Sequence, residues 1–200
     1  MRLGPDQPLF FEGEAAGRIF MVTKGFLKLY SLLGDGRRQI TGFMFPGDFI
    51  GFTTDDEYLF SAETLTDAEL WAFSKSGFAE FCGSNPDVQR ELFHLAAREI
   101  AAVQQQILML GRKNAAERMA SFLSMLLARF ERISGRHESI IELPMTRIDI
   151  ADYIGLTKET VSRMIAELRD RRLIRLVNQD RVEILDRNRL DILAEGYGGS

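Results

Sequence analysis

Apolar residues in the segment 145–172 recur with the period of an α-helix on both sides of Gly155. Before the glycine they fall three residues apart, and after it they fall at i, i+4 and i+7, which is the spacing of a buried helical face. The side chains expected to face inward are Ile148, Ala151 and Ile154 in the first helix and Val161, Ile165 and Leu168 in the second. The segment therefore predicts two amphipathic helices in succession.

Signals for helix ends support this division. Thr146 is placed to cap the first helix, and Asp149 stands three residues later, where a capping box has Glu or Gln. Gly155 supplies the left-handed exit that often ends a helix. Two helices joined by such a tight turn form a helix-turn-helix.

The polar face of the second helix begins with Lys158, Glu159, Ser162 and Arg163. In a helix-turn-helix this end of the second helix enters the major groove of DNA, where Arg, Glu and Ser hydrogen-bond to base edges. We therefore expect these four residues to read bases. The alternative is an ordinary helical hairpin whose charged residues are only solvated.

The segment 173–186 follows with alternating apolar residues, Ile174 and Leu176 against Val182 and Ile184. The turn-forming residues Asn178, Gln179 and Asp180 lie between them, so two short antiparallel strands are expected. Such a hairpin after a helix-turn-helix is a wing. The arginines that flank it, where they can meet phosphate, are Arg171, Arg172, Arg175 and Arg181.

Residues 1–85 have a different pattern, in which short apolar runs alternate with glycine-containing turns. Many short strands at that spacing predict an antiparallel β-roll of the cupin-like jelly-roll type. Most of the 15 phenylalanines lie here and are expected to fill its core.

The segment 86–111 predicts one long helix whose apolar residues step by three and four, as a coiled-coil seam requires. The seam residues are Phe93, Ala96, Ile100, Val103, Ile107 and Leu110. We predict that this helix joins two copies of the chain; the alternative is a helix packed on its own domain. A second helix over 114–133 is expected to turn inward Ala115, Met119, Phe122, Met125 or Leu126, and Phe130. The overall class is α+β, with a roll (1–85), a dimerisation helix (86–111) and a winged helix-turn-helix (112–200).

Charge and composition fit this division. The net charge of −4 separates into +2 for residues 111–200 and −6 for residues 1–110. The basic excess is small, so DNA affinity should depend on positioned arginines and on dimerisation. Cys82 is the one cysteine, which rules out a disulfide within the chain. With no signal peptide or transmembrane stretch, a cytoplasmic protein without a membrane partner is expected.

The order of roll, long helix and winged helix-turn-helix resembles the CRP/FNR bacterial transcription regulators over essentially the whole chain. Matching residues in the roll are Glu12-Gly13, Gly25, Gly34-Asp35-Gly36 and Pro46-Gly47-Asp48, and at the hinge they are Lys113 to Arg118. In the C-terminal domain they are Thr146-Arg147, Asp149-Ile150-Ala151, Gly155-Leu156-Thr157 and Glu159-Thr160-Val161-Ser162-Arg163. The last run is similar to the FNR and FixK branches, which recognise paired TTGAT-type half-sites.

The resemblance implies a role for each matching residue of the C-terminal domain. It implies that Glu159 and Arg163 read bases, that Ser162 assists, and that Thr146 and Arg147 hold phosphate. Lys158 stands where members of this family often have an apolar residue, so the base preferred at one position of the half-site is left open. The further phosphate contacts that we expect are Thr157, Thr160 and Arg181.

The residues of the roll bear on which signal it senses. Phe52 and Phe60 stand where cyclic-AMP receptors carry an acid and an arginine, and a phosphate without a cation in an apolar pocket is strongly disfavoured. An iron–sulfur cluster needs four thiolates, and Cys82 is alone, although residues upstream of this sequence can have been removed. Cys82 is a possible redox site, more often a packing residue. His94 and His137 lack an arranged partner for haem.

The sequence thus predicts a homodimeric FixK-like regulator that binds a palindromic DNA site and contacts RNA polymerase. Control of microaerobic, denitrification or nitrogen-fixation genes is what that branch implies. No phosphate loop, nucleophile elbow or zinc-ligand spacing appears, so we expect no enzyme activity, no metal and no cofactor. The alternatives are an FNR-type oxygen sensor without its N-terminal cysteines, and a sensor gated by haem or a small apolar ligand.

Overall fold

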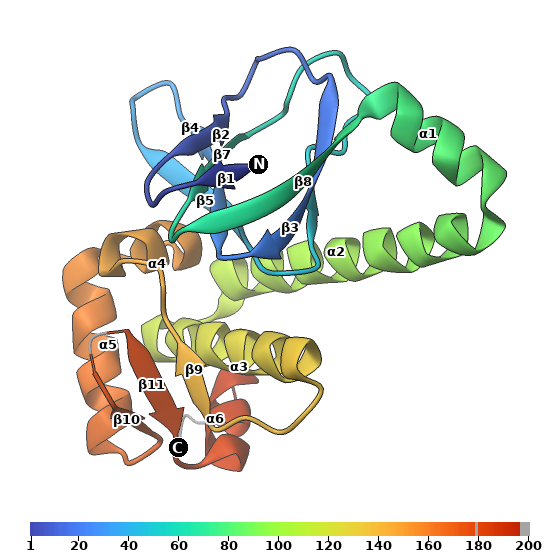
Figure 1. The fold of residues 1–200 in the computed structure, drawn as a ribbon. Coiled ribbons are helices and arrows are strands. Elements are labelled where there is room, and N and C mark those ends of the chain that lie inside the picture. Colours follow the sequence, from blue (N-terminus) through green and yellow to red (C-terminus); the bar gives the residue numbers. More distant parts are fainter. Residues whose placement is uncertain (179, 197–200) are drawn as a thin grey trace. The chain divides into compact units, whose positions relative to one another are not determined.

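A computed structural model describes residues 1–178 and 180–196 (Figure 1). The chain separates into two compact units, Met1–Val103 and Gln104–Ser200. Gln179, one of the three residues expected in the wing turn, lies outside the described residues. Among the helices of the described segments, none is both long and apolar enough to cross a membrane.

The N-terminal unit contains two four-stranded antiparallel sheets, with strand orders β1-β8-β3-β6 and β2-β7-β4-β5. The strands are β1 (Arg2–Leu3), β2 (Pro8–Phe10), β3 (Arg18–Lys24), β4 (Leu27–Leu32), β5 (Arg38–Met44), β6 (Phe49–Ile50), β7 (Ser61–Thr64) and β8 (Ala68–Ser74). This confirms the predicted β-roll. Glycine is required between β3 and β4, because Gly25 has a φ of +84° and a Cβ there would lie 2.2 Å from the carbonyl oxygen of Asp67.

Phenylalanine fills the roll less completely than predicted. Phe10, Phe20 and Phe45 are buried, whereas Phe11 and Phe81 are exposed. Phe11 lies one residue beyond the end of β2, and Phe81 lies in the helix Lys75–Ser84, none of whose residues is buried. The core is completed by aliphatic residues such as Val22, Leu27, Ile40 and Leu70.

Three helices follow the roll: α1 (Lys75–Ser84), α2 (Pro86–Arg112) and α3 (Ala115–Ser134). The long helix that starts at Pro86 is confirmed, and α1 before it was not predicted. In α3 the inward positions Met119 and Phe122 are confirmed, and Leu126 rather than Met125 is buried. Ala115 and Phe130 are only half-buried.

The C-terminal unit is a winged helix-turn-helix (Figure 1). After α3 come β9 (Ile140–Glu142), α4 (Arg147–Ile154), α5 (Lys158–Asp170), β10 (Ile174–Leu176), β11 (Arg181–Ile184) and α6 (Arg187–Ala194). The wing pairs Ile174 with Ile184 and Leu176 with Val182, as the alternation predicted. Strand β9 adds a third strand in the order β10-β11-β9, and neither β9 nor α6 was predicted.

Candidate nucleic-acid interface

The turn between α4 and α5 is held by the predicted caps. The Thr146 hydroxyl oxygen accepts from the Asp149 backbone N–H at 3.1 Å, and the Asp149 carboxylate accepts from the Thr146 backbone N–H at 3.0 Å. Gly155 ends α4 with a φ of 65°, in the left-handed region. The capping box and the glycine exit are both confirmed, and they fix where α4 begins and ends.

The buried face of α4 differs from the prediction at one position. Ala151 and Ile154 are buried as expected, but Ile148 is 49% exposed and Ile150 is fully buried. The helix has only eight residues, so the spacing of three used to choose Ile148 fits barely two turns. Packing against α3 and α5 selects the face that carries Ile150 and Ile154 instead.

Helix α5 presents two opposed faces. Val161, Ile165 and Leu168 are buried, as predicted, together with Met164. Thr157 caps the helix by accepting from the Thr160 backbone N–H at 3.2 Å. The apolar face therefore anchors α5 and leaves its N-terminal polar face outward.

All four predicted base-reading residues lie on that outward face and are exposed: Lys158, Glu159, Ser162 and Arg163. Ser162 donates its hydroxyl hydrogen to the Lys158 carbonyl at 3.0 Å, and Arg163 donates to the Thr160 hydroxyl at 3.4 Å. Within the described part of the chain, the Lys158 and Glu159 side chains have no hydrogen-bond or ion-pair partner. The N-terminus of α5 thus offers donors, acceptors and a guanidinium fork to an incoming surface.

Arg147 lies half-buried at the start of α4, in a hollow of about 520 Å³ whose wall includes Leu176 and Asn178. Burial lowers the pKa of the Arg147 guanidinium, and the attraction of Asp180 acts against this shift. An arginine remains protonated at neutral pH despite such a shift. Arg147 therefore presents a partly desolvated positive charge beside the wing.

Three of the arginines expected to meet phosphate face an acid in the free protein. Arg181 pairs with Glu142 at 2.8 Å, Arg175 with Glu183, and Arg171 with Glu167. Exposed pairs of this kind contribute little stability, so a phosphate can take over the cation at small cost. The positive electrostatic potential near the wing is consequently weaker than the number of arginines alone indicates. The Thr146 and Thr157 hydroxyls cap their helices, and the Thr160 hydroxyl accepts from the Thr157 hydroxyl at 3.0 Å.

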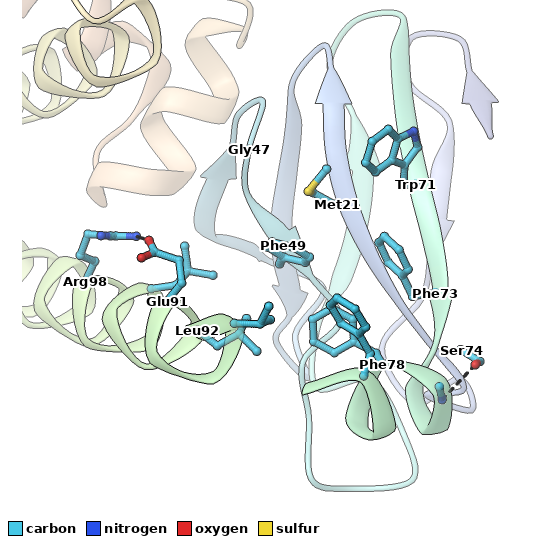
Figure 2. A pocket seen from close by; sticks show the side chains of 14 residues that line it. Met21, Gly47, Phe49, Trp71, Phe73, Ser74, Phe78, Glu91, Leu92 and Arg98 are labelled. Atoms are coloured by element: carbon cyan, nitrogen blue, oxygen red, sulfur yellow. Dashed lines mark hydrogen bonds and ion pairs between the residues drawn. The ribbon is translucent and has the colours of Figure 1, made fainter. Parts of the chain in front are cut away.

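A separate groove of about 700 Å³ lies within the N-terminal unit (Figure 2). Its walls are Phe49, Trp71, Phe73 and Phe78 on one side and the α2 residues Leu92 and Leu95 on the other. Trp71 is 61% exposed, which is unusual for so large an apolar side chain. The groove is therefore an apolar surface without a covering element among residues 1–178 and 180–196.

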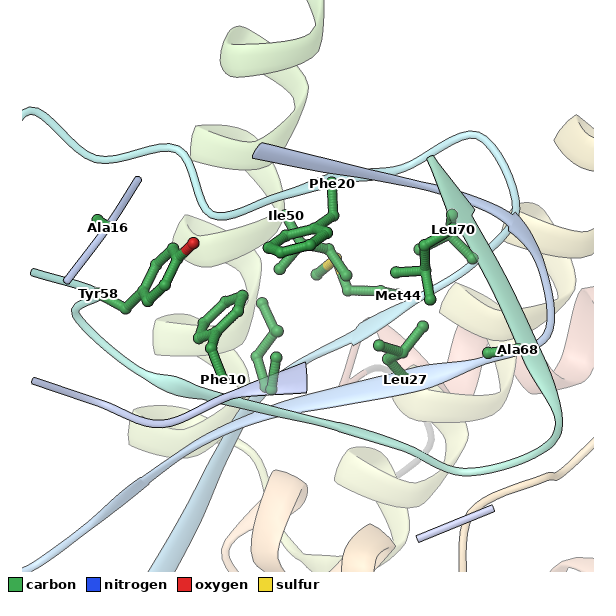
Figure 3. Packing of buried hydrophobic residues seen from close by; sticks show 12 residues of the cluster. Phe10, Ala16, Phe20, Leu27, Met44, Ile50, Tyr58, Ala68 and Leu70 are labelled. Atoms are coloured by element: carbon green, nitrogen blue, oxygen red, sulfur yellow. The ribbon is translucent and has the colours of Figure 1, made fainter. Parts of the chain in front are cut away.

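The two roll positions compared with charged residues of cyclic-AMP receptors hold aromatic side chains, Phe52 and Phe60. Phe10 stacks on Tyr58 with ring centroids 3.7 Å apart (Figure 3). Phe60 packs on the same cluster, with its ring centroid 6.1 Å from that of Phe10. Phe52 packs between Phe49 and Phe78. Both rings pack on other rings, and neither offers a charged partner to a phosphate or a ribose.

Cys82 and His137 are two further candidates for chemistry. Cys82 is half-buried in α1. His137 contacts the Glu131 carboxylate at 3.0 Å. Hydrogen bonds from His137 and from Arg187 lower the pKa of the Glu131 carboxyl. Across the described ranges no three His, Cys, Asp or Glu side chains gather as a metal site would need.

These features define a class: a winged helix-turn-helix that exposes the polar end of its second helix, preceded by a β-roll and a long helix. Comparison with known proteins agrees. Residues 117–193 match the Crp-like helix-turn-helix domain, and residues 1–85 match the cyclic nucleotide-binding domain.

Relatives extend over the whole chain. The transcriptional activatory protein AadR of Rhodopseudomonas palustris is 41% identical over 97% of this chain and 80% of its own length. The nitrogen fixation regulation protein FixK of Azorhizobium caulinodans is 38% identical over 91% of this chain and 73% of its own. The structure of FixK2 from Bradyrhizobium japonicum, 33% identical, superposes with a TM-score of 0.88 and covers 96% of this chain and 95% of that one.

The chain belongs to the CRP/FNR family of DNA-binding transcription regulators, and the FixK-like branch is favoured over the oxygen-sensing alternative. The predicted fold class and family are thereby confirmed. These relatives are named as regulators of transcription and of nitrogen fixation.

Proposed function

We propose that this protein acts as a homodimer that binds a two-fold-symmetric DNA site through the N-terminal end of α5 in each copy. The observation that supports it most strongly is the division of α5 into a buried apolar face and an exposed polar end. A helix presented in this way fits the major groove, and a two-fold dimer matches a palindromic site.

In this proposal Glu159 and Arg163 read base edges, Ser162 and Lys158 assist, and the threonine caps and arginines contact phosphate. Glu accepts from cytosine N4, and Arg donates two hydrogen bonds to guanine. The phosphate contacts fix the register of the protein on DNA and carry no sequence information. The phosphate set is Thr146, Arg147, Thr157, Thr160 and Arg181.

Dimerisation through α2 is supported by the exposure of its apolar residues. Phe93, Ile100, Val103 and Ile107 are 73%, 61%, 52% and 64% exposed, and Ala96 is exposed as well. Within α2 only Met109 is buried. A helix of 27 residues with an uncovered apolar stripe is stabilised when a second copy covers it.

The aromatic groove extends the same surface. Leu92 and Leu95, which line the groove, adjoin the seam residues Phe93 and Ala96 along α2. Because groove and seam share one helix, we assign the groove to the same occupant, α2 of a second copy. Leu110 contributes less to this seam, since it is half-buried and its Cδ2 lies against Gly155 of its own chain.

Binding to designed duplexes tests the proposal. A duplex with two inverted TTGAT-type half-sites is titrated by fluorescence anisotropy beside one with a single half-site scrambled. We expect the symmetric duplex to bind at least about 10-fold tighter, because mismatched pairs cost roughly 1–3 kcal/mol each. Equal affinities would contradict a symmetric mode of binding.

The regulatory output is proposed from the branch. The FixK and AadR names connect relatives with nitrogen fixation and with activation of transcription. We infer control of microaerobic, denitrification or nitrogen-fixation genes through contact with RNA polymerase in the cytoplasm, without enzymatic activity.

Cyclic AMP at millimolar concentration is expected to change neither the melting temperature nor the DNA affinity. A ligand of the folded state at 100 times its Kd stabilises it by about 2.7 kcal/mol, which raises the melting temperature by several degrees. Phe52 and Phe60 offer no charge to the nucleotide, so calorimetric melting curves with and without it should coincide. A clear shift would place the protein among nucleotide-gated regulators.

A further inference from the structure

The connection between α2 and α3 is short and fully hydrogen-bonded. Helix α2 ends at Arg112 and α3 begins at Ala115, so two residues separate them. The Asn114 side chain accepts from the Glu117 backbone N–H at 3.1 Å, and the Glu117 carboxylate accepts from the Asn114 backbone N–H at 2.9 Å. This capping box fixes the direction in which α3 leaves the joint.

Arg118 sits one residue beyond the capping box and donates to four backbone carbonyls. Its Nε and Nη2 donate to Lys113 at 2.9 Å and Leu110 at 2.8 Å, and its Nη1 donates to Ile154 at 3.1 Å and Gly155 at 3.2 Å. Lys113 lies in the joint and Leu110 in the last turn of α2, whereas Ile154 and Gly155 lie at the end of α4. One side chain therefore ties α2 to the helix-turn-helix.

The geometry suits arginine specifically. Helix C-termini leave carbonyls without partners and carry partial negative charge, which a cation stabilises. Arginine has five donors in a rigid plane, whereas lysine is a point charge on a flexible stem. A lysine at this position cannot reach two helix ends in fixed directions at once.

Gly155 permits the close approach that this arrangement needs. A Cβ at Gly155 would lie 3.0 Å from Leu110 Cδ2 and 3.2 Å from Arg118 Nη1. The glycine therefore serves both the left-handed exit of α4 and its contact with the end of α2.

A second tether lies on the other side of the joint. Lys113 Nζ donates to the Ser121 hydroxyl at 2.8 Å, and that hydroxyl donates to the Ala194 carbonyl at 3.2 Å. The joint is thus attached to α6 as well as to α4. All these residues belong to the C-terminal unit, as does Ile107 of the exposed seam.

We propose that Arg118 is a positioning residue that sets the half-site spacing accepted by the dimer. The inference rests on the proposed function. If α2 pairs with α2 of a second copy, the recognition helix α5 is separated from the seam only by the hydrogen-bonded joint and α4. A rigid joint fixes the separation and rotation of the two α5 helices, and it thereby fixes the spacing between half-sites.

The test measures affinity as a function of spacing. Purified full chain, wild type and Arg118→Gln, is titrated with duplexes whose half-sites are at the preferred spacing or one or two base pairs nearer or farther. One added base pair rotates a half-site by about 35° around the DNA axis. We expect the wild type to lose about 10-fold or more in affinity per step, and Arg118→Gln to lose about 3-fold or less.

Controls separate positioning from charge and stability. Arg112→Gln removes an equal charge from an exposed neighbour and should keep the wild-type spacing profile. Arg118→Lys keeps the positive charge but not the planar set of donors, so it should broaden the spacing profile. If circular dichroism shows that Arg118→Gln does not fold, Arg118→Lys tests the positioning role in its place. Simple destabilisation lowers affinity at every spacing alike and leaves the profile unchanged.

The outcomes distinguish the two proposals. A wild type without any preferred spacing overturns the symmetric dimer itself. A sharp wild-type profile that Arg118→Gln and Arg118→Lys both retain overturns the role of Arg118 and leaves the proposed function standing. A profile broadened only by the Arg118 substitutions supports the positioning role.

Discussion

Arg163→Ala is expected to abolish sequence-selective DNA binding while the protein stays folded. Arg163 is exposed at the N-terminal part of α5 and donates to the neighbouring Thr160 hydroxyl at 3.4 Å. An arginine forked to guanine contributes about 1–3 kcal/mol of discrimination, and a two-fold dimer loses that contribution twice. Because the Arg163 side chain is exposed, the melting temperature should change little.

The measurement is competition between a palindromic site and scrambled DNA of equal length. The wild type should prefer the palindrome strongly, and the Arg163→Ala protein should bind both duplexes alike. An undiminished preference in the mutant would refute the assignment of Arg163 to base reading.

Arg147→Ala provides the contrast. Arg147 is assigned to phosphate, which carries no sequence information, so the substitution should lower affinity for all duplexes by a similar factor. The slope of log affinity against log salt should become less steep by about one for each phosphate that the arginine no longer neutralises. A selective effect at one base pair would move Arg147 to the base-reading set.

Val103→Asp is expected to convert the dimer into a monomer. Val103 lies in the middle of the exposed stripe of α2, where the proposed two-fold axis would bring the two copies together. Two carboxylates would then face each other in a desolvated seam, and burying unpaired like charges costs several kcal/mol. The wild type should be a dimer at micromolar concentration without any added ligand.

Sedimentation velocity decides this second prediction, and Gln104→Asp is its matched control. Gln104 is the next residue along α2 and is also exposed, but it lies off the seam. The control adds the same charge and should leave the dimer intact. A monomeric wild type would overturn both the dimer and its independence of a ligand.

The sequence predicted the elements with long or strongly alternating patterns. The 13-residue α5 and the wing pairs Ile174–Ile184 and Leu176–Val182 are confirmed, because each repeats one period several times. The eight-residue α4 is too short for its period to choose between Ile148 and Ile150, and packing against neighbouring helices makes the choice. Strand β9, with three residues, has no pattern of its own.

The candidate site was predictable only in part. The exposed end of α5 follows from the buried face opposite it, so the base-reading set could be proposed from sequence. The ion pairs of Arg175 and Arg181 join residues on adjacent strands of the wing sheet and depend on strand pairing. The hydrogen bonds of Arg118 reach main-chain carbonyls 36 and 37 residues away, which carry no side-chain signature. That the roll does not bind a cyclic nucleotide is a prediction from Phe52 and Phe60, and the melting experiment with cyclic AMP tests it.

Selection of binding sites from random double-stranded DNA by the purified protein tests the central claim most directly. The proposed dimer predicts enriched sequences that contain two inverted copies of one short motif at a single spacing, with guanine at the position read by Arg163. Enrichment of a lone motif without an inverted partner, or no enrichment over input DNA, would contradict recognition of a symmetric site by two α5 helices.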